Sequence, residues 1–316
     1  MTDFRNPLLL VTDTCEAEPA LRRAMELVRA SGGKLTLLDV AEPMPDYLRS
    51  HLAEARYARL VQAEEQRRNA RLEILAKEAA AGGVPVTTKM LTGVIFRTAI
   101  LELLAGAHDL LIKAVDTREP ALRAPQGALD RHLLRKCPRP VWLENPEGPR
   151  RLSRILVAVN PDPAAPEDQA QAVELLRTAA TIARLNGAEL HVLHAWKLPG
   201  EWTVSPHAAA DPELAPLLGP VINARARYVE DALAAAGIAP GQVRIHLVHQ
   251  RATRAILDAL QATQPDLLVM GTVGRTGVPG FFIGNTAERV LGEATCSILA
   301  RKPAGFVSPV IPPSNA

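Results

Sequence analysis

Short apolar segments alternate with helical stretches along the whole chain, and the same alternation occurs twice. Apolar runs of this kind are typical of strands that are buried on both faces of a sheet. Parallel neighbours need a crossover connection, and the helical stretch between two successive runs supplies it. The sequence therefore predicts an α/β protein with two tandem, doubly wound parallel sheets of five strands each.

Local similarity between the halves indicates a duplication. Asp109–Ile112 reads Asp-Leu-Leu-Ile and Asp266–Val269 reads Asp-Leu-Leu-Val. When this alignment is continued without a gap, Gly127 falls on Gly284. Each half is therefore predicted to be one copy of the same β-α-β-α-β-α-β-α-β unit.

The domain boundaries follow from a Pro-, Glu- and Arg-rich linker near residue 148. We expect a first domain over residues 1–145, a second over residues 151–304, and a flexible Pro- and Ser-rich tail over residues 305–316. The pattern restarts after the linker, where Ile155 to Asn160 is predicted to correspond to Leu8 to Asp13.

The halves differ in their middle parts. From about Leu48 to Ala81, helical spacing of apolar residues predicts one long amphipathic helix. The second half instead carries an insertion from Trp196 to about Leu218, which we expect to be an irregular lid or surface loop. A helix from Val221 to Ala236 is predicted to follow it.

Composition excludes several classes of protein. A net charge of +2 and 3% aromatic residues argue against a nucleic-acid binder. No apolar run approaches the length of a membrane span, and the N-terminus has no signal pattern. Cys15, Cys137 and Cys296 lack metal-ligand spacing, so we expect small buried or half-buried thiols in a reduced, cytoplasmic protein.

Glycines gather near the C-terminus, between a predicted strand at Leu267–Met270 and a helix that starts near Asn285. A strand, a glycine loop and a helix N-terminus present backbone N–H groups to an anion. The dinucleotide fingerprint is excluded because these glycines fall three apart. The P-loop is excluded because the loop does not end in Gly-Lys-Ser/Thr.

The spacing Gly271-x2-Gly274-x9-Gly284 closely resembles the nucleotide-binding signature of the universal stress protein family, and the doubled chain resembles its two-domain E-type branch. This resemblance implies an adenine nucleotide alpha hydrolase-like fold, with the family's usual dimer replaced by a pseudo-dimer within one chain. In that arrangement the terminal strands, Val141–Leu143 and Ile298–Ala300, pair with each other. Association into further homo-oligomers stays open.

The resemblance also implies a binding site in the second half. Family members that bind ATP use the acid after the first strand for the nucleoside, and the glycine loop with the following hydroxyl for the phosphates. Carried over, Asn160 contacts the nucleoside, backbone N–H groups hold the phosphates, and Arg275 adds a charge-assisted bond. The implied nucleotide-binding residues are Ala158, Val159, Asn160, Met270, Gly271, Val273, Gly274, Arg275, Gly284, Asn285 and Thr286.

Two departures weigh on this site. Asn160 replaces the family's Asp, and Asn285 replaces its Ser or Thr. A competing interpretation needs no ligand: Asn285 as N-cap with Glu288 three residues later forms a capping box that satisfies the helix by itself.

The first half is expected not to bind phosphate, because its aligned loop has lost all glycines except Gly127 and carries acids and prolines. Asp13 is then expected to cap the following helix.

Other candidate sites fail on geometry. His191 and His194 are three apart on a predicted strand, so they point to opposite faces, and His246 and His249 do the same. Glu64 lies among arginines on the long helix, which is typical of a solvated ion-pair face. No metal site and no catalytic residue are predicted.

The sequence thus favours a stress-response protein that binds a small ligand in its second domain without substantial turnover. The ligand is expected to be ATP, ADP or AMP, with or without magnesium, or another phosphate-bearing molecule, and no cofactor is required. One alternative is a non-nucleotide scaffold, adaptor or amphipathic-ligand binder. A slow ATP hydrolase is the other.

Overall fold

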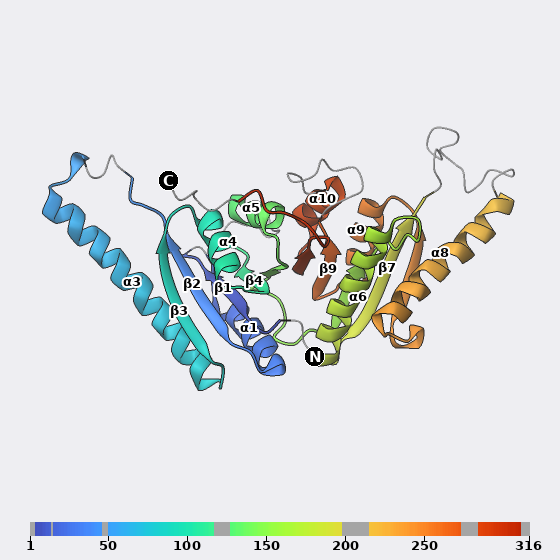
Figure 1. Ribbon diagram of the computed structural model, residues 1–316, viewed down its shortest axis with the longest axis horizontal. Coiled ribbons are helices and arrows are strands. Elements are labelled where there is room, and N and C mark those ends of the chain that lie inside the picture. Colours follow the sequence, from blue (N-terminus) through green and yellow to red (C-terminus); the bar gives the residue numbers. More distant parts are fainter. Residues whose placement is uncertain are drawn as a thin grey trace. The chain divides into compact units, whose positions relative to one another are not determined.

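The computed structural model describes residues 4–13, 15–45, 50–116, 127–197, 215–272 and 284–310, with the backbone alone for residues 215–218. The chain divides into two compact units (Figure 1). The first domain comprises Met1–Gly148 and Val307–Ala316, and the second comprises Pro149–Phe306.

The first domain is a parallel sheet in the order β3-β2-β1-β4-β5. Helices α1 and α3 cover one face, and α4 and α5 cover the other (Figure 1). Its elements are β1 (Pro7–Val11), α1 (Glu18–Ser31), β2 (Leu35–Ala41), α3 (Glu54–Ala81), β3 (Val86–Thr92), α4 (Ile95–Ala105), β4 (Leu110–Ala114), α5 (Ala128–Lys136) and β5 (Val141–Glu144).

The second domain repeats this plan in the order β10-β9-β6-β7-β8, again all parallel. Helices α6 and α8 lie on one face, and α9 and α10 on the other. Its elements are β6 (Arg154–Ala158), α6 (Pro166–Asn186), β7 (Glu189–Trp196), α8 (Ala215–Ala236), the 3-10 turn η3 (Pro240–Gln242), β8 (Arg244–His249), α9 (Ala252–Thr263), β9 (Leu267–Gly271), α10 (Asn285–Glu293) and β10 (Ser297–Arg301).

The central strands are apolar because helices cover both of their faces. Every residue of β1 and of β4 is buried, and so are the first four of β9. Strands of this kind read as continuous Leu, Ile and Val runs rather than alternating ones. The predicted fold class, two tandem doubly wound α/β domains, is therefore confirmed. Pairing of the terminal strands stays a prediction.

One aspartate in each domain holds the start of the first strand. A carboxylate oxygen of Asp109 accepts two consecutive backbone N–H groups before β1, at 2.6 and 2.9 Å. Asp266 does the same at the start of β6, at 2.5 and 2.9 Å. The duplication is thus visible in individual hydrogen bonds, at the two aspartates that the sequence alignment pairs.

The strand registers shift the predicted correspondence between β1 and β6 by one residue. Leu110 lies opposite Pro7, and its counterpart Leu267 lies opposite Ile155. Ile155 is therefore the counterpart of Pro7, and the predicted correspondence with Leu8 is wrong. Both β1 and β6 are runs of similar apolar residues, and such a run does not fix a register by itself.

Several element boundaries also differ from the prediction. Helix α3 begins at Glu54 rather than near Leu48. Helix α8 begins at Ala215 rather than at Val221, so Pro220 lies inside the helix. Of the insertion predicted between β7 and α8, residues 198–214 lie outside the described ranges.

The end of the chain is not a free tail throughout. Residues 307–310 belong to the first domain, where the Ser308 hydroxyl donates to the Lys136 carbonyl at 2.7 Å and Val310 is 8% exposed. The prediction of a flexible tail from residue 305 is therefore wrong for this short segment. Residues 311–316 lie outside the description.

No helix within the described ranges is long and apolar enough to cross a membrane.

Candidate functional site

The carboxyl ends of β6 and β9 meet in the second domain, as the sequence predicts. Ala158 lies opposite Met270, and Gly271 follows as the last residue of β9. Met270 is buried in the core at 3% exposure. Val159 is also buried, its N–H donates to the Leu193 carbonyl at 3.0 Å, and a histidine ring contacts its carbonyl. These residues frame the site through their backbone.

A backbone hydrogen bond connects the residue after β9 to the N-cap residue of α10. The Gly284 N–H donates to the Thr272 carbonyl at 2.8 Å, and the Thr272 N–H donates to the Arg301 carbonyl at 3.2 Å. The Gly284 N–H is therefore already bonded within the protein, which corrects the expectation that it binds a phosphate. Val273, Gly274 and Arg275 lie outside the described residues.

Helix α10 has no capping box. Its N-cap is Gly284, which has no side chain, and Asn285 is the first helical residue with an exposed side chain. The competing interpretation, in which Asn285 caps the helix and removes the need for a ligand, is thus wrong. The Thr286 hydroxyl accepts a hydrogen bond from Thr253 at 3.1 Å and keeps its own hydrogen to donate.

Thr272 is the unusual residue of this region. It is 2% exposed, and its hydroxyl oxygen has no hydrogen-bond partner anywhere in the described part of the chain. A buried hydroxyl without a partner costs about 1–3 kcal/mol. The carbonyl of the same residue accepts the Gly284 N–H, and the hydroxyl therefore lies near the start of the predicted phosphate loop.

The strand registers change the counterpart of Asn160 in the first domain. With the corrected register, its counterpart in the first domain is Thr12 rather than Asp13. Asn160 follows the end of β6 and is exposed. Its predicted nucleoside contact stays a prediction.

The first domain fills the equivalent place with its own charges. Lys113 of β4 and Asp130 of α5 form an ion pair at 2.9 Å, with 3% of each side chain exposed. Lys113 also donates to the Ala114 carbonyl at 2.6 Å. Burial would lower the pKa of Lys113, but Asp130 and Cys15 outweigh it and the pKa is raised, so the lysine stays charged. The carboxylate in the first turn of α5 thus takes the position where a helix N-terminus binds an anion.

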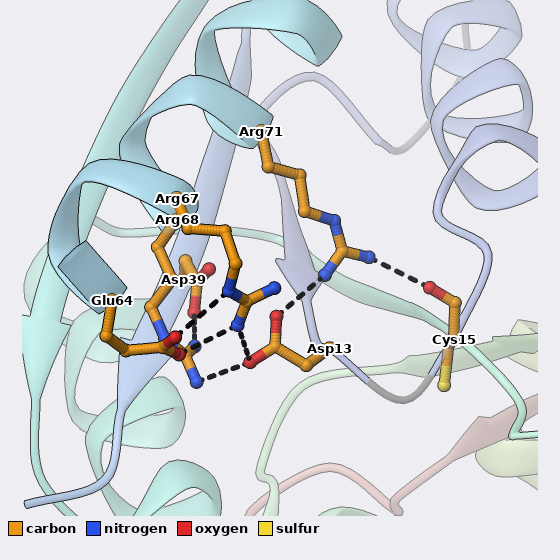
Figure 2. Close-up of polar contacts among 7 residues, drawn as sticks. All are labelled: Asp13, Cys15, Asp39, Glu64, Arg67, Arg68 and Arg71. Carbon is orange, nitrogen blue, oxygen red and sulfur yellow. Dashed lines mark hydrogen bonds and ion pairs between the residues drawn. The ribbon is translucent and has the colours of Figure 1, made fainter. Parts of the chain in front are cut away.

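An arginine cluster lies at the carboxyl ends of β1 and β2. Figure 2 shows Arg67, Arg68 and Arg71 extending from α3 toward Asp13. Their shortest nitrogen–oxygen distances to that carboxylate are 2.8, 2.5 and 3.2 Å. Asp13 therefore anchors α3. Helix α1 has Ala17 as N-cap without a side-chain bond, so the predicted capping role of Asp13 is wrong.

The same cluster extends into the core. Arg68 also binds Asp39 of β2 at 2.6 Å, and the Asp39 side chain is fully buried. Burial raises the pKa of Asp39, although Arg68 opposes the shift. Glu64 lies on the outer side, where hydrogen bonds from Arg67 and Arg68 lower its pKa to about 2. The predicted solvated ion-pair face is thus correct for Glu64 but misses the buried contact of Arg68.

Two histidines that the sequence treated separately meet across strands. His191 of β7 and His246 of β8 approach to 3.0 Å between ring nitrogens, and Glu189 contacts the other nitrogen of His191 at 3.3 Å. The sequence argument considered only pairs on one strand, and it did not consider a pair between neighbouring strands. Among the described residues, no three His, Cys, Asp or Glu side chains are placed to hold a metal ion.

The three cysteines are free thiols. Cys137 is buried, Cys15 and Cys296 are half-buried, and burial raises the pKa of Cys296 to about 12. The expectation of small apolar or half-buried residues is confirmed.

Sequence reasoning missed Thr272, Lys113 and Asp130. A signal for them existed in the internal alignment, where Thr272 falls on Val115, Lys113 on Met270 and Asp130 on Ala287. A buried polar residue opposite an apolar counterpart marks a position that one copy uses differently.

Comparison with known proteins agrees with this geometry. The universal stress protein family matches residues 4–143 and 152–302. Universal stress protein E of Salmonella typhi is 30% identical over 98% of both chains, and its Escherichia coli K12 counterpart is equally similar. A putative universal stress protein from Pseudomonas aeruginosa UCBPP-PA14 superposes with a TM-score of 0.73 at 26% identity, covering 96% of this chain and 95% of that one. The chain belongs to the universal stress protein family.

Proposed function

We propose that this protein acts in the stress response by binding a phosphate-bearing small molecule in its second domain, without substantial turnover. Adenine nucleotides are the first ligands to test, because the family resemblance of the glycine spacing implies them. The ligand lies at the carboxyl ends of β6 and β9, against the N-terminus of α10. Binding there uses neutral donors on the backbone and on hydroxyl side chains.

The observation that carries the proposal is the Thr272 hydroxyl. It is buried, it has no partner among the described residues, and it lies next to a helix start that no N-cap side chain covers. A helix N-terminus attracts anions through its free N–H groups and its dipole. A phosphate oxygen at this place supplies the acceptor that the hydroxyl lacks.

The first domain supports the proposal by contrast. Its counterpart of Thr272 is Val115, which is 4% exposed and has no polar side-chain atom. Its helix N-terminus already faces the Asp130 carboxylate and Lys113. A negatively charged ligand there competes with a carboxylate that is part of the fold, so we infer one binding site per chain.

A calorimetric titration with ATP, ADP and AMP, with and without Mg²⁺, tests the proposal. Saturable binding is expected for the wild type. Thr272→Val weakens binding about 10- to 100-fold, because a hydrogen bond to a charged group contributes about 1.5–3 kcal/mol. The unliganded variant melts at the same temperature or higher, because the substitution removes a buried hydroxyl without a partner.

The matched control is Val115→Thr, which places the same hydroxyl in the first domain. It is expected to lower the melting temperature and to leave ligand binding unchanged. Equal binding by the wild type and Thr272→Val contradicts the site. Phosphate release from ATP in the same samples would indicate the slow hydrolase instead.

The scaffold alternative has one observation in its favour. No residue of α3 from Glu54 to Arg71 is buried, and the helix exposes Leu60 to 43% and Ile74 to 66%. Such a surface is available for a partner or an amphipathic ligand. This alternative predicts no binding of any nucleotide by the wild type.

A further inference from the structure

The Gln171 side chain lies directly against the end of β9. A Cβ atom added to Gly271 would stand 2.8 Å from the Gln171 Nε2 atom and 3.2 Å from its Cδ atom. Real Cβ atoms essentially never show a contact under 3.0 Å, so the Gln171 amide can keep this position only while residue 271 is glycine and would have to shift to accommodate a Cβ atom. The absence of a side chain at Gly271 thus makes room for a group from α6.

The Gln171 amide nitrogen is buried and has no hydrogen-bond acceptor within the part of the chain that the structure describes. The Thr272 hydroxyl oxygen is likewise buried without a hydrogen-bond partner among the described residues. One of these groups lies against Gly271 and the other belongs to the next residue, Thr272. Buried polar groups in native proteins are nearly always bonded, so two such exceptions beside the Gly271–Thr272 peptide unit point to an external acceptor.

An extension of α6 places Gln171 there. Helices α1 and α6 both end at a glycine in the left-handed region, Gly32 at φ 64° and Gly187 at φ 62°. Helix α1 has 14 residues and α6 has 21, so the additional 21 − 14 = 7 residues, 166–172, lie at the start of α6. Gln171 is in this extension. Its counterpart in the first domain, Glu16, precedes α1 and is exposed.

In the first domain, the position equivalent to Gly271 carries a side chain. Ala114 is the counterpart of Gly271 and has the Cβ atom that Gly271 lacks. The extension of α6, the glycine and the threonine are therefore present together in the second domain and absent together from the first.

We propose that the Gln171 carboxamide donates a hydrogen bond to an oxygen of the ligand held at Gly271–Thr272 and thereby helps to select it. This inference rests on the proposed function of the second domain. It assigns part of the recognition to α6, outside the glycine loop. A neutral amide donor suits a phosphoryl oxygen, and a carboxylate in its place repels that oxygen.

The test uses ATP with Mg²⁺ as the probe in calorimetric titrations of the full chain. Gln171→Leu is expected to weaken binding about tenfold, and Gln171→Glu to weaken it further, because repulsion is added to the lost donor. Gly271→Ala displaces the amide and is expected to weaken binding to a similar extent. The double variant Gln171→Leu/Gly271→Ala then shows little additional loss, because both changes remove one contact.

Melting temperatures separate binding from folding. The unliganded Gln171→Leu variant is expected to be at least as stable as the wild type, because it loses a buried donor without a partner. Wild-type affinity in Gln171→Leu would overturn this inference and leave the proposed function in place. Absence of binding by the wild type would overturn the proposed function, and this inference with it.

Discussion

Lys113 and Asp130 show how single side chains distinguish the two copies of one fold. In the second domain the same two positions hold Met270 and Ala287, which are buried at 3% exposure each. The surrounding backbone therefore accepts either an ion pair or two apolar residues. Replacing a buried ion pair by apolar residues is often neutral, whereas removing one partner leaves an uncompensated charge.

At this scale we predict that Asp130→Ala destabilises the first domain by about 3–5 kcal/mol, because Lys113 is left buried and charged. The double variant Lys113→Met/Asp130→Ala, which copies the second domain, is expected to recover most of that loss. Urea unfolding of the three proteins measures both effects. A double variant that is less stable than Asp130→Ala would contradict the explanation.

Helix α3 shows how an element can be held without a continuous apolar face. Its buried residues are Leu72, Leu75 and Ala79, all in its C-terminal half. Helices depend on packing for most of their stability in water. The middle of the helix instead contacts the ends of β1 and β2 through Arg67, Arg68 and Arg71 (Figure 2).

At the scale of this element, Arg68→Leu is expected to destabilise the first domain by about 3–5 kcal/mol, because Asp39 loses its ion-pair partner in the core. The segment from Glu54 to Arg67 is expected to exchange its amide hydrogens faster. Since burial already raises the pKa of Asp39, the loss should shrink as the pH falls and the carboxyl becomes neutral.

Two further variants separate the causes. Arg68→Leu/Asp39→Leu is expected to regain stability while fast exchange in the early part of α3 persists. Arg289→Ala, which breaks an exposed pair with Glu293 on α10, is expected to change stability by less than about 1 kcal/mol. Unchanged exchange in Arg68→Leu would show that the cluster does not hold the helix.

At the scale of the whole molecule, the two domains differ at the ends of β4 and β9. The first has the Lys113–Asp130 ion pair there, and the second has a Thr272 hydroxyl without a partner among the described residues. Because the first domain fills its own site with Lys113 and Asp130, we predict about one nucleotide per chain at saturation. Native mass spectrometry with increasing ATP measures this ratio directly. Two bound nucleotides per chain would contradict the assignment of a closed first domain.

The fold could be predicted from the sequence because parallel strands buried on both faces leave a strong apolar pattern. The site could be predicted only in part. Glycine spacing located its entrance. The bond of the Gly284 amide, and the lack of partners for Gln171 and Thr272 among the described residues, depend on tertiary contacts that spacing does not reveal. The register of β6 was missed for a related reason, since a uniform apolar run has no feature that marks one alignment over its neighbour.

Residues 307–310 have a consequence for synthesis. Domains generally form in order as the chain leaves the ribosome. Here the first domain also includes residues 307–310, which are translated only after the second domain is complete. A chain whose translation ends at residue 306 would therefore have an incomplete first domain, although all strands of the second domain are present.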